Sequence, residues 1–257
     1  MILVMDVGNT NIKMGVFDGE KNIKSFRVAT DLRKTGDEYG VIVSALLAQK
    51  GLSFADIDGV MMSSVSPALN YTLEHMCRYF IGKDPIVMAP GIKTGLSIKY
   101  DNARELGSDR IVNAVAAVKK YGGPCIVVDF GTATTFSVVS GKNEFLGGAI
   151  CPGIKTATDA LVENAAKLPR IELEKPPCVI GRSTITNMQS GVIYGFIGLV
   201  ENIVRMIKKE LGDDNVKVIA TGGMSQLMQY SEKKTIDVID RDLTLSGLKI
   251  IYDLNKE

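Results

Sequence analysis

One short pattern occurs twice in this chain. Asp6-Val7-Gly8-Asn9-Thr10-Asn11 lies near the start, and Asp129-Phe130-Gly131-Thr132-Ala133-Thr134 lies near the middle. Each copy follows an apolar, β-prone run and precedes another that ends in glycine, which predicts a strand, a tight polar turn and a second strand. The copies lie about half of the 257 residues apart. The sequence therefore predicts two similar subdomains that face each other across a cleft.

The residue types of this turn suit the binding of a phosphate group. Glycine lets backbone N–H groups approach an anion closely, and asparagine and threonine add short polar groups. A carboxylate at the end of the preceding strand can hold Mg²⁺ directly or through water. A single copy is more typical of an ordinary hairpin turn. Two copies in matching strand contexts favour the functional interpretation.

Composition narrows the class of protein. The net charge is +1 with dispersed basic residues, which argues against an extended nucleic-acid surface. The four cysteines are far apart and only one histidine, His75, is present, so we expect reduced thiols and no structural zinc. The chain begins with a strand rather than a basic leader, and its longest apolar run, residues 191–200, is short for a bilayer span. These features predict a soluble cytoplasmic protein without a membrane partner.

Strands and helices alternate in the first half. Residues 35–38 have the spacing of a capping box and open a helix that Gly51 closes. A strand is predicted at 57–62, and Pro67 then starts a helix that ends near residue 80. A short strand follows at 86–88. This alternation indicates an α/β fold with parallel pairing beside the antiparallel hairpin.

A long loop over residues 89–107 delivers Gly107-Ser108-Asp109-Arg110 to the start of a helix. Ser108 or Asp109 could be only the N-cap of that helix. Alternatively, Asp109 accepts a proton from a substrate hydroxyl and Arg110 binds a carboxylate. Spacing alone leaves both interpretations open.

The second half repeats the plan. We expect a strand at 145–150, a helix after Gly153, an irregular segment at 167–181 and a long helix over 184–211. A strand at 216–220, a second at 236–239 and a helix from residue 242 complete the chain. The boundary lies near residues 121–124, which predicts subdomains over 1–121 and 122–257.

Together with Gly147-Gly148-Ala149-Ile150-Cys151-Pro152-Gly153, these motifs resemble those of type III pantothenate kinase over essentially the whole chain. That family belongs to the acetate kinase, sugar kinase, Hsp70 and actin superfamily. The resemblance implies an α/β fold of duplicated ribonuclease H-like (actin-like ATPase) subdomains around a central cleft. Family members often have alanine where Ser108 stands. This difference leaves Asp109 and Arg110 in place.

The resemblance also implies an activity and its residues. The activity is ATP-dependent phosphorylation of the pantothenate hydroxyl, the first committed step of coenzyme A synthesis, by a homodimer that uses Mg²⁺ and a monovalent cation, K⁺ or NH₄⁺. The implied ATP and phosphate contacts are Asp6, Val7, Gly8, Asn9, Thr10, Asn11, Ile12, Lys13 and Thr132. The implied pantothenate contacts are Tyr100, Gly107, Ser108, Asp109, Arg110 and Thr184. Asp109 matches the general base, Asp6 the Mg²⁺ ligand and Asp129 the monovalent-cation ligand.

Plainer roles stay open for several of these residues. Lys13 could be a solvated hairpin residue, Thr184 an N-cap and Tyr100 part of loop packing. Two competing functions also remain: another small-molecule kinase of the superfamily, acting on a sugar or a carboxylic acid, and a non-catalytic ATP-binding regulator or filament protein.

Overall fold

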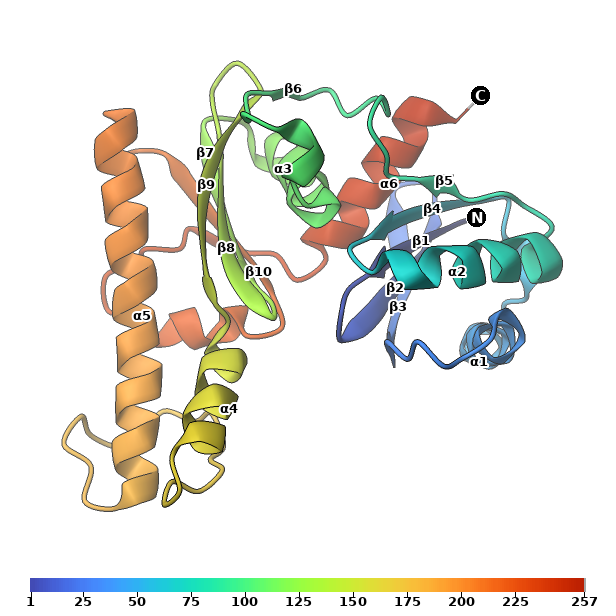
Figure 1. The fold of residues 1–257 in the computed structure, drawn as a ribbon. Helices are drawn as coiled ribbons and strands as arrows, with labels where there is room; N and C mark the ends of the chain where they lie inside the picture. Colours follow the sequence, from blue (N-terminus) through green and yellow to red (C-terminus); the bar gives the residue numbers. More distant parts are fainter. Residues whose placement is uncertain (257) are drawn as a thin grey trace. The chain divides into compact units, whose positions relative to one another are not determined.

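The structure is a computed structural model that describes residues 1–256 as two compact units, each with one sheet (Figure 1). The first unit contains Met1–Leu96, Tyr100–Lys119 and the chain from Asp242 onward, and the second contains Ser97–Lys99 and Lys120–Arg241. The α/β class predicted from the alternating pattern is confirmed.

The sheet of the first unit has the strand order β3-β2-β1-β4-β5. Neighbours β1 and β2, and β2 and β3, are antiparallel, whereas β1–β4 and β4–β5 are parallel. Its strands are β1 (Ile2–Val7), β2 (Asn11–Asp18), β3 (Lys21–Ala29), β4 (Gly59–Ser64) and β5 (Ile86–Val87). Its helices are α1 (Gly36–Ala48), α2 (Asn70–Met76), which continues as a π-helical turn over Cys77–Ile81, α3 (Ser108–Tyr121) and α6 (Leu243–Asn255).

Both faces of this sheet are covered. On one face, alternate strand residues such as Leu3 and Met62 pack with Tyr39 of α1 and Leu73 of α2 in a fully buried core. On the other face, strand residues pack against α3 and α6 in a second core, formed by Val4, Phe17, Met61, Val112, Val115, Leu245, Leu248 and Ile251. Strand residues of opposite parity therefore face different helices.

The sheet of the second unit has the order β11-β10-β7-β8-β9-β6. Its strands are β6 (Ser97–Ile98), β7 (Cys125–Phe130), β8 (Ala133–Val139), β9 (Glu144–Pro152), β10 (Lys217–Gly222) and β11 (Val238–Ile239). The three antiparallel strands β7, β8 and β9 and the parallel strands β10 and β11 repeat the order of β1 to β5. The second unit is thus a topological copy of the first, with β6 added at one edge.

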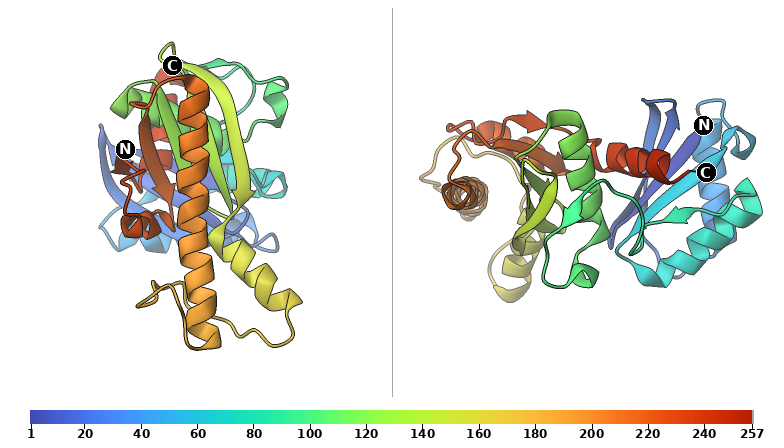
Figure 2. Two further views of the ribbon diagram at one scale, coloured as in Figure 1. Left: turned by 90° about the vertical axis from the view of Figure 1, so that its left-hand side faces the viewer. Right: turned by 90° about the horizontal axis from the view of Figure 1, so that it is seen from above.

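Two helices belong to the second unit: α4 (Ile154–Asn164) and α5 (Thr184–Leu211). Buried residues of α5, including Ile193, Phe196 and Val200, pack against this sheet, and Figure 2 shows α5 running along it. Within residues 1–256, α5 alone is long and apolar enough to pass a length-and-composition test for a membrane span, with 33% of its apolar window buried. Core helices of soluble proteins pass the same test.

Several predictions are confirmed by these elements. Thr35 caps α1 through a complete capping box with Glu38. The helix predicted at 184–211 has those bounds, the segment 167–181 has no regular structure, and all four cysteines are free. Both predicted hairpins are present.

Other features differ from the sequence prediction. The edge strands β3 and β6 were not anticipated, because neither has a continuous apolar run. The C-terminal helix α6 packs with the first unit, because Leu245, Leu248 and Ile251 cover Val4 and Met61. The two compact units therefore do not coincide with the segments 1–121 and 122–257, since the chain from Asp242 onward belongs to the first unit.

Candidate functional site

A row of polar side chains crosses the first sheet next to the first turn. The strand register places Asp6 of β1 opposite Ser63 of β4 on one side and opposite Lys13 of β2 on the other. Lys13 in turn lies opposite Arg27 of β3. Cross-strand partners project from the same face of a sheet. The row therefore runs Ser63, Asp6, Lys13, Arg27 along one face.

Packing identifies this face. Val4, two residues before Asp6, and Met61, two residues before Ser63, both contact α3 and α6. On β3, Phe26 and Val28 pack into the opposite core, which leaves Arg27 on the same face as Asp6. The row therefore lies on the face that also carries α3, whose first turn contains the predicted base.

The first turn is held in place by residues of the segment after β3. Within the turn, the Gly8 N–H donates to the Asn11 carbonyl at 3.0 Å. The Thr30 N–H donates to the Thr10 carbonyl at 3.0 Å, and the Thr30 hydroxyl donates to the Gly8 carbonyl at 2.7 Å. These bonds satisfy three turn carbonyls, those of Gly8, Thr10 and Asn11, and hold the turn in one conformation.

A buried tyrosine fixes the position of Thr30. Tyr39 of α1 is fully buried, and its hydroxyl accepts from the Asp31 N–H at 3.0 Å and donates to the Asp31 carbonyl at 3.1 Å. Because Asp31 follows Thr30 directly, the core of the first unit is connected to the turn through two consecutive residues. The sequence pattern gave no indication of this link.

A serine network joins the start of α3 to the end of β4. The fully buried Ser63 hydroxyl donates to Ser108 Oγ at 2.8 Å, and the Ser108 hydroxyl donates to the Ser64 carbonyl at 3.3 Å. Helix α3 begins at Ser108, which places Ser108 inside the helix, and the Asp109 carboxylate accepts a backbone N–H of this first turn. The Ser108 hydroxyl bonds to β4 instead of capping its own helix.

This network places Asp109 in the first turn of α3, beside the strand that lies next to Asp6. An Asp109 Oδ1 atom accepts from the Arg110 N–H at 2.9 Å. A Cβ added to Gly107 would lie 2.5 Å from that oxygen, so the carboxylate rests over Gly107 and a larger residue there would displace it. Glycine at 107 is therefore required by the position of the carboxylate.

Burial raises the pKa of the Asp109 carboxyl above its ordinary value, against the opposing effects of the Arg110 N–H bond and the Arg110 charge. A carboxylate with a raised pKa is a better proton acceptor when ionised. The Arg110 side chain is itself only 6% exposed. The start of α3 thus combines a half-buried carboxylate with a buried guanidinium.

In the second unit, the corresponding row contains one carboxylate, and its other residues are uncharged. The register places Asp129 of β7 between Thr221 of β10 and Thr135 of β8, and Thr135 lies opposite Ile150 of β9. A Cβ added to Gly222 would lie 2.5 Å from Asp129 Oδ1, so the carboxylate lies directly over this glycine. The group that lies against the backbone at the end of β10 is therefore the Asp129 carboxylate.

The second turn packs against the start of α4. The Gly153 N–H and the Thr156 hydroxyl both donate to the Thr132 carbonyl, at 3.0 and 2.7 Å. A Cβ on Gly153 would lie 2.3 Å from the Gly131 carbonyl oxygen, so only glycine fits there. The motif around residue 153 therefore supports the second turn, while the side chain of Thr132 is exposed.

The remaining predicted substrate residues lie apart along the chain. Tyr100 is half-buried and belongs to the first unit together with Asp6 to Lys13 and Gly107 to Arg110. Thr184 is exposed and belongs to the second unit with Asp129 and Thr132. The alternative that Thr184 is an N-cap is wrong, because Ser183 caps α5 through a capping box with Thr186.

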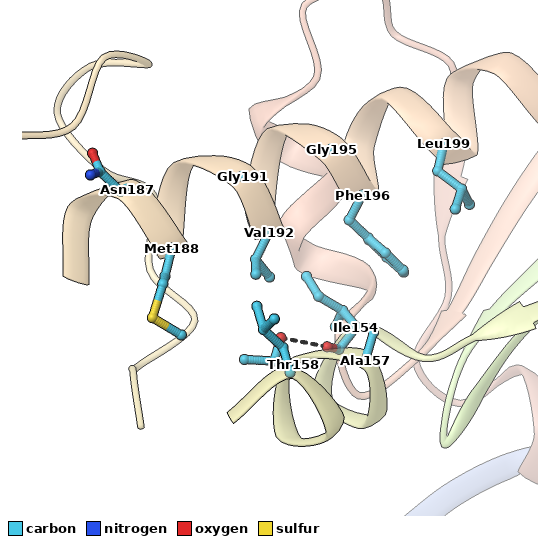
Figure 3. Close-up of a pocket in the computed structure, with 11 residues that line it drawn as sticks. Ile154, Ala157, Thr158, Asn187, Met188, Gly191, Val192, Gly195, Phe196 and Leu199 are labelled. Carbon is cyan, nitrogen blue, oxygen red and sulfur yellow. Dashed lines mark hydrogen bonds between the residues drawn. The ribbon is translucent and has the colours of Figure 1, made fainter. Parts of the chain in front are cut away.

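A hollow of about 520 Å³ lies between α4 and α5 in the second unit (Figure 3). In Figure 3, Met188 and Val192 of α5 point toward the α4 side, where the Thr158 hydroxyl donates to the Ile154 carbonyl at 2.7 Å. Its lining contains no charged residue. This hollow suits an apolar partner and not a phosphate group.

Within residues 1–256, no group of three or more His, Cys, Asp or Glu side chains is arranged to bind a metal. Mg²⁺ in phosphoryl transfer needs only one or two carboxylates, because substrate phosphates and water supply its other ligands. The half-buried Asp6 carboxylate beside the first turn fits that requirement. For a monovalent cation, Asp129 is accompanied by the fully buried Thr221 hydroxyl, which has no hydrogen-bond partner within residues 1–256.

Sequence reasoning missed three residues of the polar row and its supports: Arg27, Thr30 and Ser63. Each becomes visible only through cross-strand register or a hydrogen bond to a distant segment. The hairpin pairing of β2 with β3 was the one signal that could have revealed Arg27 opposite Lys13.

Comparison with known proteins gives a family match and several structural neighbours. Residues 2–206 match the family model described as type III pantothenate kinase. A Campylobacter jejuni protein, provisionally described as a Baf family transcriptional activator, superposes with a TM-score of 0.61 at 21% identity, over 98% of each chain.

Two other solved structures belong to sugar kinases or proteins described as such. A Sinorhizobium meliloti protein, provisionally described as a 2-dehydro-3-deoxygalactonokinase, has a TM-score of 0.62 at 10% identity, over 100% of this chain and 97% of its own. The polyphosphate/ATP-glucomannokinase of Arthrobacter sp. strain KM has a TM-score of 0.51 at 14% identity, over 98% of each chain. At these identities the neighbours establish the fold alone, which this chain shares with them.

Proposed function

Since this chain belongs to the type III pantothenate kinase family, we propose that it transfers the γ-phosphoryl group of ATP to the primary hydroxyl of pantothenate. The observation that carries this proposal is a hydrogen bond that connects the strand beside Asp6 to the start of α3, where Asp109 lies. Ser63 lies beside Asp6 in the polar row and donates to Ser108, the neighbour of Asp109. The phosphate turn and the base therefore share one support.

The first turn, from Asp6 to Lys13, would hold the nucleotide phosphates. Backbone N–H groups of the turn and the Lys13 ammonium supply positive potential toward the phosphate oxygens. Asp6 would hold Mg²⁺, which would supply positive charge to offset that of the phosphate groups. The exposed Thr132 of the second turn is the proposed nucleotide contact in the other unit.

Asp109 would act as general base. In the transfer, the pantothenate hydroxyl oxygen forms a bond to the γ-phosphorus, the bond from that phosphorus to the leaving ADP oxygen breaks, and the hydroxyl proton passes to the Asp109 carboxylate. Arg110 is proposed to neutralise the carboxylate of pantothenate. Gly107 and Ser108 position this pair, and Tyr100 and Thr184 are proposed contacts of the same substrate.

Asp129 is the proposed ligand of a monovalent cation. The carboxylate lies over Gly222 and beside two threonines in the second sheet, so the ligands on offer are all oxygen atoms. K⁺ and NH₄⁺ both suit such a site, and either would reduce the negative charge near the transferred group. The chain does not favour one over the other.

A homodimer formed through the α4–α5 side of the second unit is also proposed. Large apolar side chains are exposed on α4, on α5 and on the segment before α5, at Leu161, Val179, Ile180 and Ile185, and Leu161 also lines the hollow. A second copy with the same apolar face would remove this surface from water. Light scattering should give twice the chain mass, and Ile185→Asp should shift it toward the monomer. Operation in the cytoplasm as the first step of coenzyme A synthesis completes the proposal.

The test of the reaction is ATP turnover by the purified protein, with and without pantothenate, in Mg²⁺ buffer containing K⁺ or only Na⁺. Pantothenate-dependent ADP release, with phosphopantothenate identified by mass spectrometry, is the expected result. ATP binding without pantothenate-dependent turnover under either cation would contradict the proposal. A panel of sugars and carboxylic acids would then identify another kinase substrate, and ATP-dependent light scattering would identify a filament-forming regulator.

A further inference from the structure

The polar row ends in two cations on neighbouring strands. Lys13 of β2 and Arg27 of β3 are direct cross-strand partners on the same face of the first sheet. Neither forms an ion pair in the part of the chain that the structure describes. Like charges directly opposite each other destabilise a sheet. A stable fold tolerates such a pair most readily where an anion binds between the two groups.

The position of the pair indicates what that anion is. Asn11 lies two residues from Lys13 on the turn side and is paired with Ala29 of β3. Thr30, which follows Ala29, donates its N–H and its hydroxyl to carbonyl groups of the turn. The two cations therefore lie at the turn end of the sheet, one register step from the segment that would receive the phosphates. Lys13 is half-buried, and Arg27 is exposed on the edge strand.

Neighbouring residues leave the approach to this pair open. The residues beside Arg27 on the same face are Ser25 and Ala29, both small and exposed. Gly15, two residues from Lys13 and away from the turn, is covered by Leu245 of α6, so the open side of the pair is the turn side, where Asn11 and Ala29 are exposed. An arginine fork can hold two oxygens of one phosphate, whereas the lysine ammonium acts as a point charge.

We propose that Arg27 is a second cationic ligand for the terminal phosphates of the nucleotide and acts together with Lys13 across β2 and β3. The inference rests on the proposed function, because it takes a nucleoside triphosphate as the ligand. It extends the phosphate site from the turn onto the edge strand. The bound polyphosphate would add negative charge beside Arg27, whereas the Asp6 carboxylate lies opposite Lys13 only.

The test measures binding without turnover. The dissociation constants of Mg-ATP, Mg-ADP and AMP are measured by calorimetry for the wild type, Arg27→Gln, Arg27→Lys and Lys21→Gln. The control residue Lys21 is an exposed cation on the same strand, opposite Asp18 at the other end. Arg27→Gln should weaken Mg-ATP about tenfold to a hundredfold, the range for a hydrogen bond to a charged group. It should leave AMP unchanged, Arg27→Lys should recover part of the loss, and Lys21→Gln should match the wild type.

Thermal unfolding without nucleotide gives a second readout. Removal of one like charge should leave Arg27→Gln at least as stable as the wild type, which also shows that the variant folds. The inference would be overturned if the dissociation constant of Arg27→Gln for Mg-ATP lay within twofold of the wild-type value. It would also be overturned if the substitution weakened AMP binding as much as Mg-ATP binding. If the wild type binds Mg-ATP in an Arg27-dependent manner but phosphorylates no pantothenate, the reaction proposal fails and this inference stands.

Discussion

The two units carry the same turn motif on the same strand order, yet the residues beside each motif differ. In the first unit the row across the sheet is Ser63, Asp6, Lys13 and Arg27. In the second unit the equivalent row is Thr221, Asp129, Thr135 and Ile150. One carboxylate therefore stands beside cations, and the other stands among hydroxyl groups.

Turn length produces part of this difference. In the first hairpin Val7 pairs with Ile12, so four residues form the loop, whereas in the second Phe130 pairs with Thr134 and only three do. The extra residue leaves the first loop with more backbone N–H groups, and Thr30 holds its carbonyls. In the second loop, Thr132 is held through its carbonyl by α4. The two copies of the motif thus differ in loop length and in the segments that support them.

The largest expected effect concerns Asp109, the carboxylate in the first turn of α3, on the face of the sheet that carries the first row. Asp109→Asn should lower pantothenate-dependent turnover by about 10²- to 10⁴-fold, the range for general base catalysis. Because burial raises the pKa of Asp109, wild-type turnover should fall as the pH drops through that raised pKa. Turnover against pH for the wild type, and turnover of the variant at neutral pH, check both statements. Near-normal activity in the variant would remove Asp109 from the chemistry.

The same shift has a consequence for stability. A carboxyl whose pKa is higher in the folded than in the unfolded state contributes stability at low pH, and this contribution is lost as the pH rises through the folded pKa. The ionised Asp109 therefore costs stability at neutral pH, and Asp109→Asn should raise the Tm while activity is lost. A lower Tm would mean that the ionised carboxylate supports the fold instead.

A smaller effect, on the free energy of unfolding, is expected for the hydrogen bonds between Ser63 of the first row and Ser108 of α3. Ser108→Ala leaves the buried Ser63 hydroxyl without its acceptor, which costs about 1–3 kcal/mol of unfolding free energy. The double variant Ser63→Ala/Ser108→Ala should recover much of this loss, because the buried Ser63 hydroxyl is then absent and only the Ser64 carbonyl loses a donor, at 3.3 Å. Denaturant unfolding of the two single variants and the double variant measures the coupling. Strictly additive losses would mean that the two hydroxyls act independently.

The second row is tested through its own carboxylate. Asp129→Asn should lower turnover in K⁺ by about tenfold, or 1.4 kcal/mol, and should leave turnover in Na⁺ nearly unchanged. Mg-ATP binding should persist, because the residues of the first row are intact. Turnover compared across K⁺, NH₄⁺ and Na⁺ measures this. An unchanged K⁺ response would break the proposed division of roles between the rows.

The smallest effect is expected at the support of the first turn. Thr30→Val removes the bond to the Gly8 carbonyl, worth about 0.5–1.5 kcal/mol, and should raise the KM for ATP up to tenfold with little change in kcat. Thr30→Ser should restore most of the affinity. Steady-state kinetics with ATP varied separate this positioning role from a loss of folded protein, which would lower kcat alone.

Local signals account for what could be predicted from the sequence. The capping box at Thr35, the long apolar helix from Thr184 and both hairpins depend on residues close together in the chain. The strand β3 was missed because only Ile23, Phe26 and Val28 pack into the core and the rest is polar.

The site residues also divide into those with a local sequence signal and those without one. Asp6, Lys13 and Asp109 lie in motifs that can be read along the chain. Ser63 and Arg27 enter the row only through pairing between strands. The bond between the Ser63 and Ser108 hydroxyls likewise joins α3 to a distant strand, so the local pattern at residues 107–110 could not reveal it.

The return of α6 to the first unit affects how the protein can be made. The ribosome releases β1 to β5 early, yet the face formed by Val4, Phe17 and Met61 lacks Leu245, Leu248 and Ile251 until the last part of the chain emerges. A nascent chain that ends before residue 243 would expose this apolar face, and exposed apolar surface on partly folded chains promotes aggregation. The first unit is thus begun before the second and completed after it, so premature termination upstream of α6 should yield insoluble fragments.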